Sequence, residues 1–91
     1  MVKNNGISVI IPNYNGRYLL AEIIPPLYTA LQQTGLPYEI IISDDKSADD
    51  SVTYIRSAFP EIKVLESDKN RGFSPAINKG IFIAEYDLLL L

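Results

Sequence analysis

Short apolar runs occur at four places along the chain, each bounded by polar or turn-forming residues. The runs at 7–12 (ISVIIP) and 38–43 (YEIIIS) are rich in β-branched residues and almost wholly apolar, which is typical of strands covered on both faces. The runs at 62–66 (IKVLE) and 86–91 (YDLLLL) predict two further strands.

Three segments in which apolar residues recur at helical spacing separate these strands: 18–33, 47–59 and 75–84. The residues that begin or interrupt them are Pro25 and Pro26 inside the first, Ser47 and Asp50 spaced like a capping box, and Ser74 as an N-cap before Pro75. Because a proline removes a helical hydrogen bond, the first segment is predicted to be a kinked helix or two short helices.

Strands that alternate with helices through short loops predict an α/β fold, a Rossmann-like parallel sheet with flanking helices and right-handed crossovers. In such sheets ligands bind at the carboxyl ends of the strands. This rule brings three polar segments to one edge of the sheet: PNYNGR (12–17), SDDKS (43–47) and DKNRGF (68–73). The sequence thus predicts a ligand site at this edge without naming the ligand.

Composition narrows the chemistry that such a site can carry. The chain has no histidine and no cysteine, which excludes Ser-His-Asp or Cys-His catalysis, disulfides and thiolate metal sites within it. Lys and Arg number 8 against 11 Asp and Glu, and this net charge of −3 does not favour nucleic acid as a partner. No apolar run approaches the ~20 residues that span a bilayer. The N-terminus does not resemble a secretory signal, and neither a GxGxxG nor a GxxxxGK[ST] motif is present.

Asp44 and Asp45 directly follow a buried strand, where like charges repel and hydration is lost. One interpretation is that one acid caps the next helix and the other is solvated. The other interpretation is that one accepts a ligand N–H, such as the imide of a uracil ring, while its neighbour holds the loop through main-chain N–H groups. Because adjacent residues leaving a strand point to opposite faces, the two carboxylates are not expected to form a general acid–base pair.

Tyr14 and Arg71 are the other candidates at this edge. Tyr14 either shields the end of the first strand or offers a flat surface to a base, and such stacking contributes about 1–3 kcal/mol per base. Arg71 either faces water or meets a phosphate or a base carbonyl. Asn13, Asn15 and Gly16 tolerate the unusual backbone angles of a turn, and for Asn13 and Gly16 a purely conformational role is favoured.

Three segments now suggest a family: ISVIIPNYNG (7–16), EIIISDDKSADDS (39–51) and NRGFSPAINKGI (70–81). Their order and spacing resemble those of family 2 glycosyltransferases of the GT-A fold, and the resemblance extends from Ile7 to Leu91. It implies a nucleotide-sugar donor and, in general, inversion at the anomeric carbon. It also implies that residues 1–91 are the N-terminal nucleotide-sugar-binding part of an incomplete glycosyltransferase domain with a partial GT-A fold.

Residue by residue, the resemblance implies that Pro12, Tyr14, Asp44, Asp45 and Arg71 bind the nucleotide. Pro12 and Tyr14 match the family's first loop, where the aromatic residue stacks on the base. Asp45 matches the aspartate that contacts the base imide, and Asp44 matches its more structural neighbour. The segment NRGFSPAINKG matches a stretch whose loop lies near the donor, which makes Arg71 a donor contact.

The chain departs from the family pattern in two ways. Lys46 stands where the family often has glycine, which leaves the carboxylates in place but alters the loop backbone. The family's Asp-x-Asp motif follows the strand at YDLLLL and is not reached. The metal ligand, the catalytic base and the acceptor-binding half are therefore expected beyond Leu91, and no catalytic or metal-binding residue is assigned within the chain. Asp87 is expected to precede this strand and is not taken as a metal ligand.

The resemblance therefore implies a glycosyltransferase within a longer chain, with residues 1–91 inactive alone. The sugar would pass from a UDP- or dTDP-linked donor to a hydroxyl of an acceptor sugar or lipid-linked glycan, with Mg²⁺ or Mn²⁺ at the diphosphate. Cell-envelope polysaccharide biosynthesis is the expected process. The expected location is cytoplasmic, or peripheral at the inner face of the membrane.

Two other functions fit parts of this pattern. A non-catalytic nucleotide-sugar-binding or regulatory module on the same fold would lack the Asp-x-Asp motif downstream. A phosphoacceptor receiver domain also has adjacent acids at the edge of a parallel sheet. It needs them after the first strand, however, where this chain has NYNGR.

Overall fold

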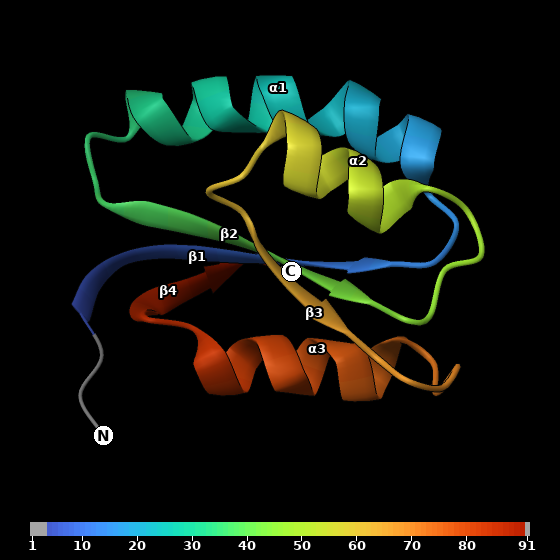
Figure 1. Ribbon diagram of the computed structural model, residues 1–91. Helices are drawn as coiled ribbons and strands as arrows, with labels where there is room; N and C mark the ends of the chain where they lie inside the picture. The colour runs from blue at the N-terminus through green and yellow to red at the C-terminus, as the bar shows by residue number, and fades with distance from the viewer. Residues whose placement is uncertain (1–3, 91) are drawn as a thin grey trace.

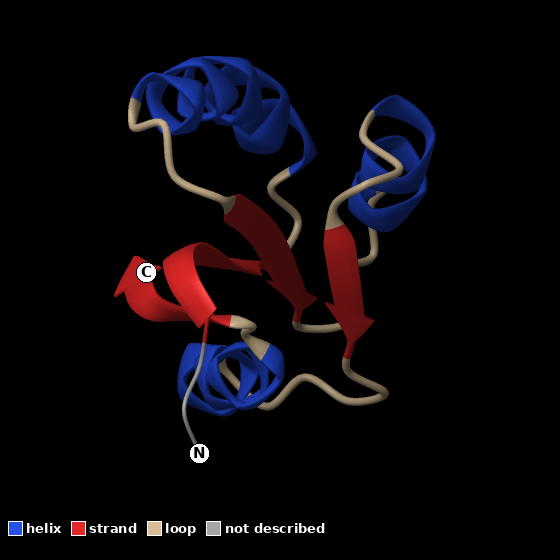
Figure 2. Ribbon diagram, turned by 90° about the vertical axis from the view of Figure 1, so that its left-hand side faces the viewer, coloured by secondary structure: helices blue, strands red, loops and turns tan. Residues whose placement is uncertain are grey.

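One parallel sheet organises residues 4–90, which are the residues that the computed structural model describes. Its strands lie in the order β3-β2-β1-β4, with the bounds β1 Asn4–Asn13, β2 Tyr38–Asp44, β3 Lys63–Glu66 and β4 Tyr86–Leu90. The helices that connect them are α1 Arg17–Gln33, α2 Ser51–Ala58 and α3 Phe73–Ile83. α1 and α2 cover one face of the sheet and α3 covers the other (Figures 1 and 2). The predicted parallel α/β sheet is confirmed, and Leu91, the last residue of the expected fourth strand, lies outside the described residues.

The two central strands are buried on both faces. In their parallel register Val9 lies beside Ile40, and Ile10 lies beside Ile41. Val9 and Ile40 belong to the core under α1 and α2, whereas Ile10 and Ile41 pack with Ala84 in the core on the α3 side. Because alternate residues of a strand face opposite sides, a continuous β-branched run is needed to fill both cores.

α1 runs through Pro25 and Pro26 as a single helix, so the alternative of two short helices is wrong. The buried side of this helix carries Leu20, Ile24 and Leu31, which pack against the sheet. Both prolines lie exposed on the outer side. On that exposed side, carbonyl groups that lose their helical N–H donor can bond to water instead. Packing of the apolar face against the sheet then keeps the helix continuous.

The predicted capping box of the second helix is wrong. α2 begins at Ser51, and its N-cap Asp50 makes no side-chain capping hydrogen bond. Asp49 instead accepts hydrogen bonds from the hydroxyl and the N–H of Ser51. Burial raises the pKa of Asp49, but these bonds and the N–H of Arg17 outweigh it and lower the pKa below its ordinary range.

The start of the third helix also differs from the prediction. α3 begins at Phe73, with Gly72 rather than Ser74 as its N-cap, and Pro75 occupies the third helical position. Gly72 has a φ of 88°, a conformation that glycine adopts without a steric penalty. The chain therefore turns into the helix two residues earlier than Pro75 suggests.

Pairing with β4 lengthens β1 beyond its predicted start at Ile7. β1 begins at Asn4, whose N–H donates to the carbonyl of Glu85 at 3.1 Å and which pairs with Tyr86. Asp87 lies inside β4 rather than before it, and its Oδ1 accepts the N–H of Gly6 at 3.4 Å. A Cβ at Gly6 would meet the Tyr86 ring at 2.4 Å, so this close approach requires glycine.

Candidate functional site

The loops that follow β1 and β2 and the segment that follows β3 meet at the carboxyl edge of the sheet. The N–H of Asp45 donates to the carbonyl of Asn13 at 2.9 Å, and the N–H of Ser67 donates to the carbonyl of Asp44 at 2.9 Å. Main-chain hydrogen bonds therefore continue past the strand ends and hold the polar segments at one edge, which confirms the predicted convergence.

Asp44 is the buried junction between the first two of these segments. It is 2% exposed, and its Oδ1 accepts hydrogen bonds from Asn13 Nδ2 at 2.8 Å and from Ser47 Oγ at 2.6 Å. Its Oδ2 accepts the N–H of Ser47 at 2.8 Å. A carboxylate removed from water is stabilised by such donors. The side chain thus fixes the ends of β1 and β2 to each other.

The first loop is shaped by one left-handed residue and one close contact. Asn15 has a φ of 55°, and its side-chain oxygen accepts the N–H of Ala48 at 2.7 Å. Gly16 has an ordinary φ of −102°, but a Cβ there would meet Asn13 Oδ1 at 2.5 Å. The expectation of unusual backbone angles holds for Asn15 alone. Asn13 is a buried hydrogen-bond donor in β1, and Gly16 provides space.

Lys46 occupies the tight turn after the two acids. Its φ is 58°, in the left-handed region that favours glycine, and its side chain is exposed. The backbone of the turn therefore has the conformation that a glycine would adopt most easily. This explains physically why a glycine suits the position.

Asp45 points to the other side of the sheet. It is 3% exposed; its Oδ1 accepts the N–H of Arg71 at 2.8 Å and its Oδ2 accepts the N–H of Gly72 at 3.0 Å. This carboxylate therefore holds the loop before α3 through main-chain N–H groups. The guanidinium of Arg71 extends outward and lies 3.6 Å from the carboxylate of Asp68.

Asn70 links Asp45 to Tyr14, and the sequence did not single it out. One atom of its side-chain amide faces two acceptors, the carbonyl oxygen of Asp45 at 3.1 Å and Oδ2 of Asp45 at 2.5 Å, so this atom is the nitrogen. The amide oxygen then accepts a hydrogen bond from the Tyr14 hydroxyl at 3.3 Å. Tyr14 remains 44% exposed. Its hydroxyl is anchored while part of the side chain stays accessible.

The five predicted nucleotide-binding residues thus fall into two groups. Tyr14, Asp45 and Arg71 come together around Asn70. Asp44 and Pro12 lie in the strands below: Asp44 ends β2, and Pro12 is half-buried in β1 and pairs with Ser43.

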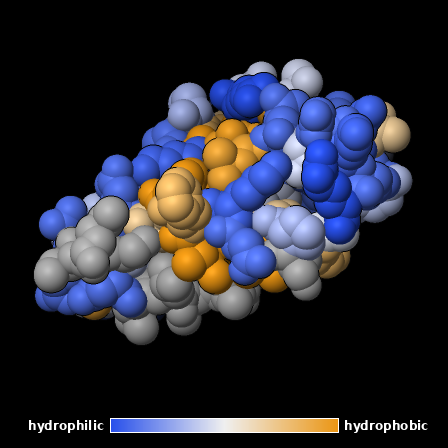
Figure 3. All heavy atoms as spheres, turned by 90° about the horizontal axis from the view of Figure 1, so that it is seen from below, coloured by the Kyte–Doolittle hydropathy of each residue, from blue (hydrophilic) through white to orange (hydrophobic). Residues whose placement is uncertain are grey.

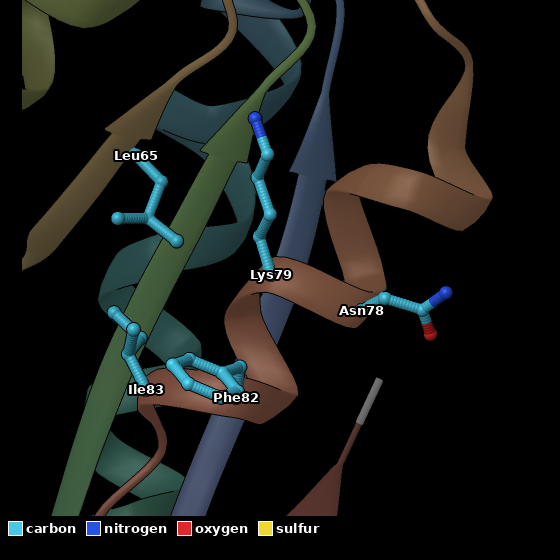
Figure 4. Close-up of a pocket in the computed structure, with 5 residues that line it drawn as sticks. All are labelled: Leu65, Asn78, Lys79, Phe82 and Ile83. Atoms are coloured by element: carbon cyan, nitrogen blue, oxygen red, sulfur yellow. The ribbon is translucent and has the colours of Figure 1, made fainter.

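An apolar groove lies on the α3 side of the sheet, lined by none of the predicted site residues. It has a volume of about 430 Å³, and its lining comes from β3 and α3: Leu65, Asn78, Lys79, Phe82 and Ile83. Phe82 is 88% exposed, and apolar side chains gather on this face (Figure 3). Lys79 runs from α3 toward the carboxyl ends of the strands, whereas Asn78 points away from Leu65 (Figure 4).

Residues 4–90 contain no candidate metal centre and no candidate membrane span. No group of three or more acidic side chains in this range could hold a metal ion. None of the helices in this range combines the length and the apolar character needed to cross a membrane.

Comparison with known sequences decides the family. The sequence profile of glycosyl transferase family 2 matches residues 8–91. The chain belongs to this family. The dolichol-phosphate mannosyltransferase of Pyrococcus furiosus is 38% identical to this family 2 chain over 88 residues, which cover 93% of the chain and 24% of the relative.

Solved structures show the same fold. S. aureus TarS superposes with a TM-score of 0.74 at 23% identity, over 92% of this chain and 26% of that protein. The mannosyltransferase PcManGT of Pyrobaculum calidifontis, solved with GDP-Man and Mn²⁺, gives a TM-score of 0.71 at 23% identity, over 89% of this chain and 25% of that protein. The chain thus has a partial GT-A fold and spans about a quarter of the length of these three proteins.

Proposed function

We propose that this family 2 chain is the N-terminal nucleotide-sugar-binding part of a glycosyltransferase domain. In the full-length protein, a sugar would pass from a UDP- or dTDP-linked donor to an acceptor hydroxyl with inversion. The observation that carries the nucleotide-binding role is the hydrogen-bonded series of Tyr14, Asn70 and Asp45 at the carboxyl edge of the sheet. It puts an accessible aromatic side chain beside a hydrogen-bond acceptor, which is the pair that recognition of a base requires.

Each side chain at this edge has a task in the proposal. Tyr14 stacks on the base, and the carboxylate of Asp45 accepts its imide N–H. The outward guanidinium of Arg71 donates to a base carbonyl or to the diphosphate. Asp44 and Pro12 stabilise the ends of β2 and β1, the strands that Asp45 and Tyr14 follow.

The chemistry at the anomeric carbon is assigned to residues beyond Leu91. A carboxylate there would take the proton of the acceptor hydroxyl as its oxygen bonds to the anomeric carbon and the bond to the diphosphate breaks. Mg²⁺ or Mn²⁺ would neutralise the leaving diphosphate, and the Mn²⁺ in the Pyrobaculum structure supports this requirement. Within residues 4–90, no group of three or more acidic side chains could hold a metal ion. The metal ligands are therefore also proposed to lie beyond Leu91.

The acceptor is proposed to be a sugar or a lipid-linked glycan. The name of the Pyrococcus relative, which refers to dolichol phosphate, supports an acceptor carried on a lipid. Cell-envelope polysaccharide synthesis at the cytoplasmic face of a membrane is the corresponding role. Residues 1–91 alone are proposed to be inactive, and sugar transfer by them alone would contradict this.

A calorimetric titration of UDP into the full-length protein tests the stacking role. Tyr14→Ala is expected to weaken UDP binding by about 5- to 150-fold, because a stacked base contributes about 1–3 kcal/mol. Tyr18→Ala is the matched control, since Tyr18 is 83% exposed in the first turn of α1 and its ring lies 5.8 Å from the guanidinium of Arg17. Pyrophosphate should bind both variants as it binds the wild type. Equal UDP affinity in all three proteins would refute the role of Tyr14.

Alanine is unsuitable for testing whether Asp45 accepts the base N–H, because its carboxylate also accepts the N–H groups of Arg71 and Gly72. Asp45→Asn keeps the size of the side chain but replaces one acceptor with a donor. We expect it to lower UDP affinity, whereas Glu22→Gln, which neutralises an exposed acid of α1, should not. If the two variants bind UDP alike, Asp45 does not contact the base.

A further inference from the structure

The carboxylate of Asp45 has a limited number of free acceptor positions. An ionised carboxylate offers about four, two on each oxygen. On Asp45, the N–H of Arg71 occupies one acceptor position of Oδ1. The N–H of Gly72 and the side-chain amide of Asn70 occupy both acceptor positions of Oδ2. Within the described contacts, Oδ1 therefore keeps one position and Oδ2 is full.

Nucleobases differ in how many N–H groups they would direct at this carboxylate. Uracil and thymine present one imide N–H between two carbonyl groups. Guanine presents two adjacent donors, its ring N–H and its exocyclic amino group, and both carboxylate oxygens are needed to pair them. With the ring N–H on Oδ1, the amino group would face Oδ2 and the amide nitrogen of Asn70, which is itself a donor. The carboxylate of Asp45 is 3% exposed, and a donor left unpaired against this buried group weakens binding.

We propose that Asn70 is a specificity-determining residue of the nucleotide site. By occupying Oδ2 of Asp45, its side-chain amide favours bases with a single N–H and disfavours guanine. The carbonyl oxygen and Oδ2 of Asp45, which only accept, fix the orientation of the amide, and its oxygen is then free to accept the Tyr14 hydroxyl. This inference rests on the proposed function, since it requires that Asp45 faces the base.

Three nucleotides test the inference on the wild-type full-length protein: UDP, GDP and IDP. The hypoxanthine base of IDP keeps the ring N–H and carbonyl of guanine but lacks the amino group. IDP is expected to bind at least about 10-fold more tightly than GDP, because an unpaired buried donor lowers affinity by about this factor. UDP is also expected to bind more tightly than GDP.

Variants of Asn70 should change this order. Asn70→Ala and Asn70→Leu free a position on Oδ2, so the ratio of IDP to GDP affinity should fall by about 10-fold or more, the effect of one added hydrogen bond to a charged group. General loosening of the loop would weaken all three nucleotides by a similar factor and leave the ratio unchanged. Lys69→Ala, an exposed neighbour in the same loop, is the matched control and should keep the wild-type ratio.

The outcomes separate the two levels of the proposal. GDP binding the wild type as tightly as IDP, or an unchanged ratio in both Asn70 variants, overturns the role of Asn70 while UDP binding still supports the nucleotide site. If none of the three nucleotides binds the wild type, the proposed function fails as well. The wild-type comparison of IDP with GDP needs no variant and decides the inference even where a substitution prevents folding.

Discussion

Asn13 Nδ2 donates a hydrogen bond to Asp44 Oδ1 over 2.8 Å, and the two residues are 4% and 2% exposed. This bond joins the last residue of β1 to the last residue of β2, underneath the loops that carry Tyr14 and Asp45. Each group would be costly to bury alone, so the pair stabilises the sheet edge only while both members are present.

We therefore expect Asn13→Ala to lower the free energy of unfolding by about 2–3 kcal/mol, since it removes a donor from a buried carboxylate. Urea denaturation followed by circular dichroism measures the change. Asn78→Ala, at an exposed position of α3, is the control and should stay within about 0.5 kcal/mol of the wild type. The double variant Asn13→Ala/Asp44→Ala should lose less than the sum of the single losses, and strict additivity would show that the pair is not coupled.

Lys46→Gly should stabilise the protein. A residue with a Cβ held at a φ of 58° costs about 1–2 kcal/mol, while glycine adds about 0.5–1 kcal/mol of unfolded-chain entropy, so a net gain of up to about 1.5 kcal/mol remains. Lys46→Ala also removes the charge but keeps a Cβ at this positive φ, so its free energy of unfolding should not rise. Thermal unfolding of the three proteins distinguishes the cases, and a gain in Lys46→Ala equal to that in Lys46→Gly would point to charge instead of backbone.

Gly80→Ala should destabilise the protein although alanine is the better helix former by about 1 kcal/mol. A Cβ at Gly80 would lie 2.5 Å from Cγ2 of Ile10, so α3 could not stay at its present distance from β1. Overpacking of this kind costs about 1–3 kcal/mol. Combining Gly80→Ala with Ile10→Ala should remove part of that loss, and a full additive loss in the denaturation midpoint would contradict the steric explanation.

Glu39, near the start of β2, is expected to make the stability of the protein depend on pH. Burial raises the pKa of Glu39, but hydrogen bonds from Lys63, Ser8 and the N–H of Glu85 outweigh it and lower the pKa below its ordinary value of 4.5. Lys63 Nζ lies 2.8 Å from Oε1, and the hydroxyl of Ser8 donates to Oε2 over 2.6 Å. For a depressed carboxyl pKa, the stabilisation is complete above the unfolded value and is lost as the pH falls through the folded value.

The free energy of unfolding of the wild type should therefore decline as the pH falls below about 4.5. Glu39→Gln should be less stable than the wild type at pH 7 and should show a shallower decline. Glu22→Gln, at an exposed position of α1, should follow the wild-type profile. Parallel acid profiles for Glu39→Gln and the wild type would mean that another group carries the pH dependence.

Much of the fold could be predicted because its signals are local. The β-branched runs of β1 and β2 and the helical spacing in α1 identify the elements and their buried faces. The failures involve partners that are distant in sequence or geometry that depends on the loop. Ser47 bonds to Asn13 and Asp44 instead of capping α2, and β1 extends to Asn4 because β4 pairs with it.

The candidate site was predicted in part for the same reason. The rule for parallel sheets places Tyr14, Asp45 and Arg71 at one edge, and the structure confirms that they lie together. Their roles toward a nucleotide remain predictions. Asn70 was missed because an asparagine in a polar loop carries no local signal of a bond to Tyr14. The available indications were its position next to Arg71 and its place at the start of NRGFSPAINKG, the segment expected near the donor.

The central place of β1 has a consequence for synthesis on the ribosome. Within residues 4–90, β1 is made before the other strands, whereas β4, which pairs with one of its edges, is made after them; the contact between Gly6 and Asp87 joins residues 81 positions apart. At about 5–20 residues per second, that edge stays without its native partner for roughly 4–16 s after β1 is made. Nascent chains are therefore most exposed to mispairing at β1. Translation pauses before β4 should increase aggregation more than pauses before β1.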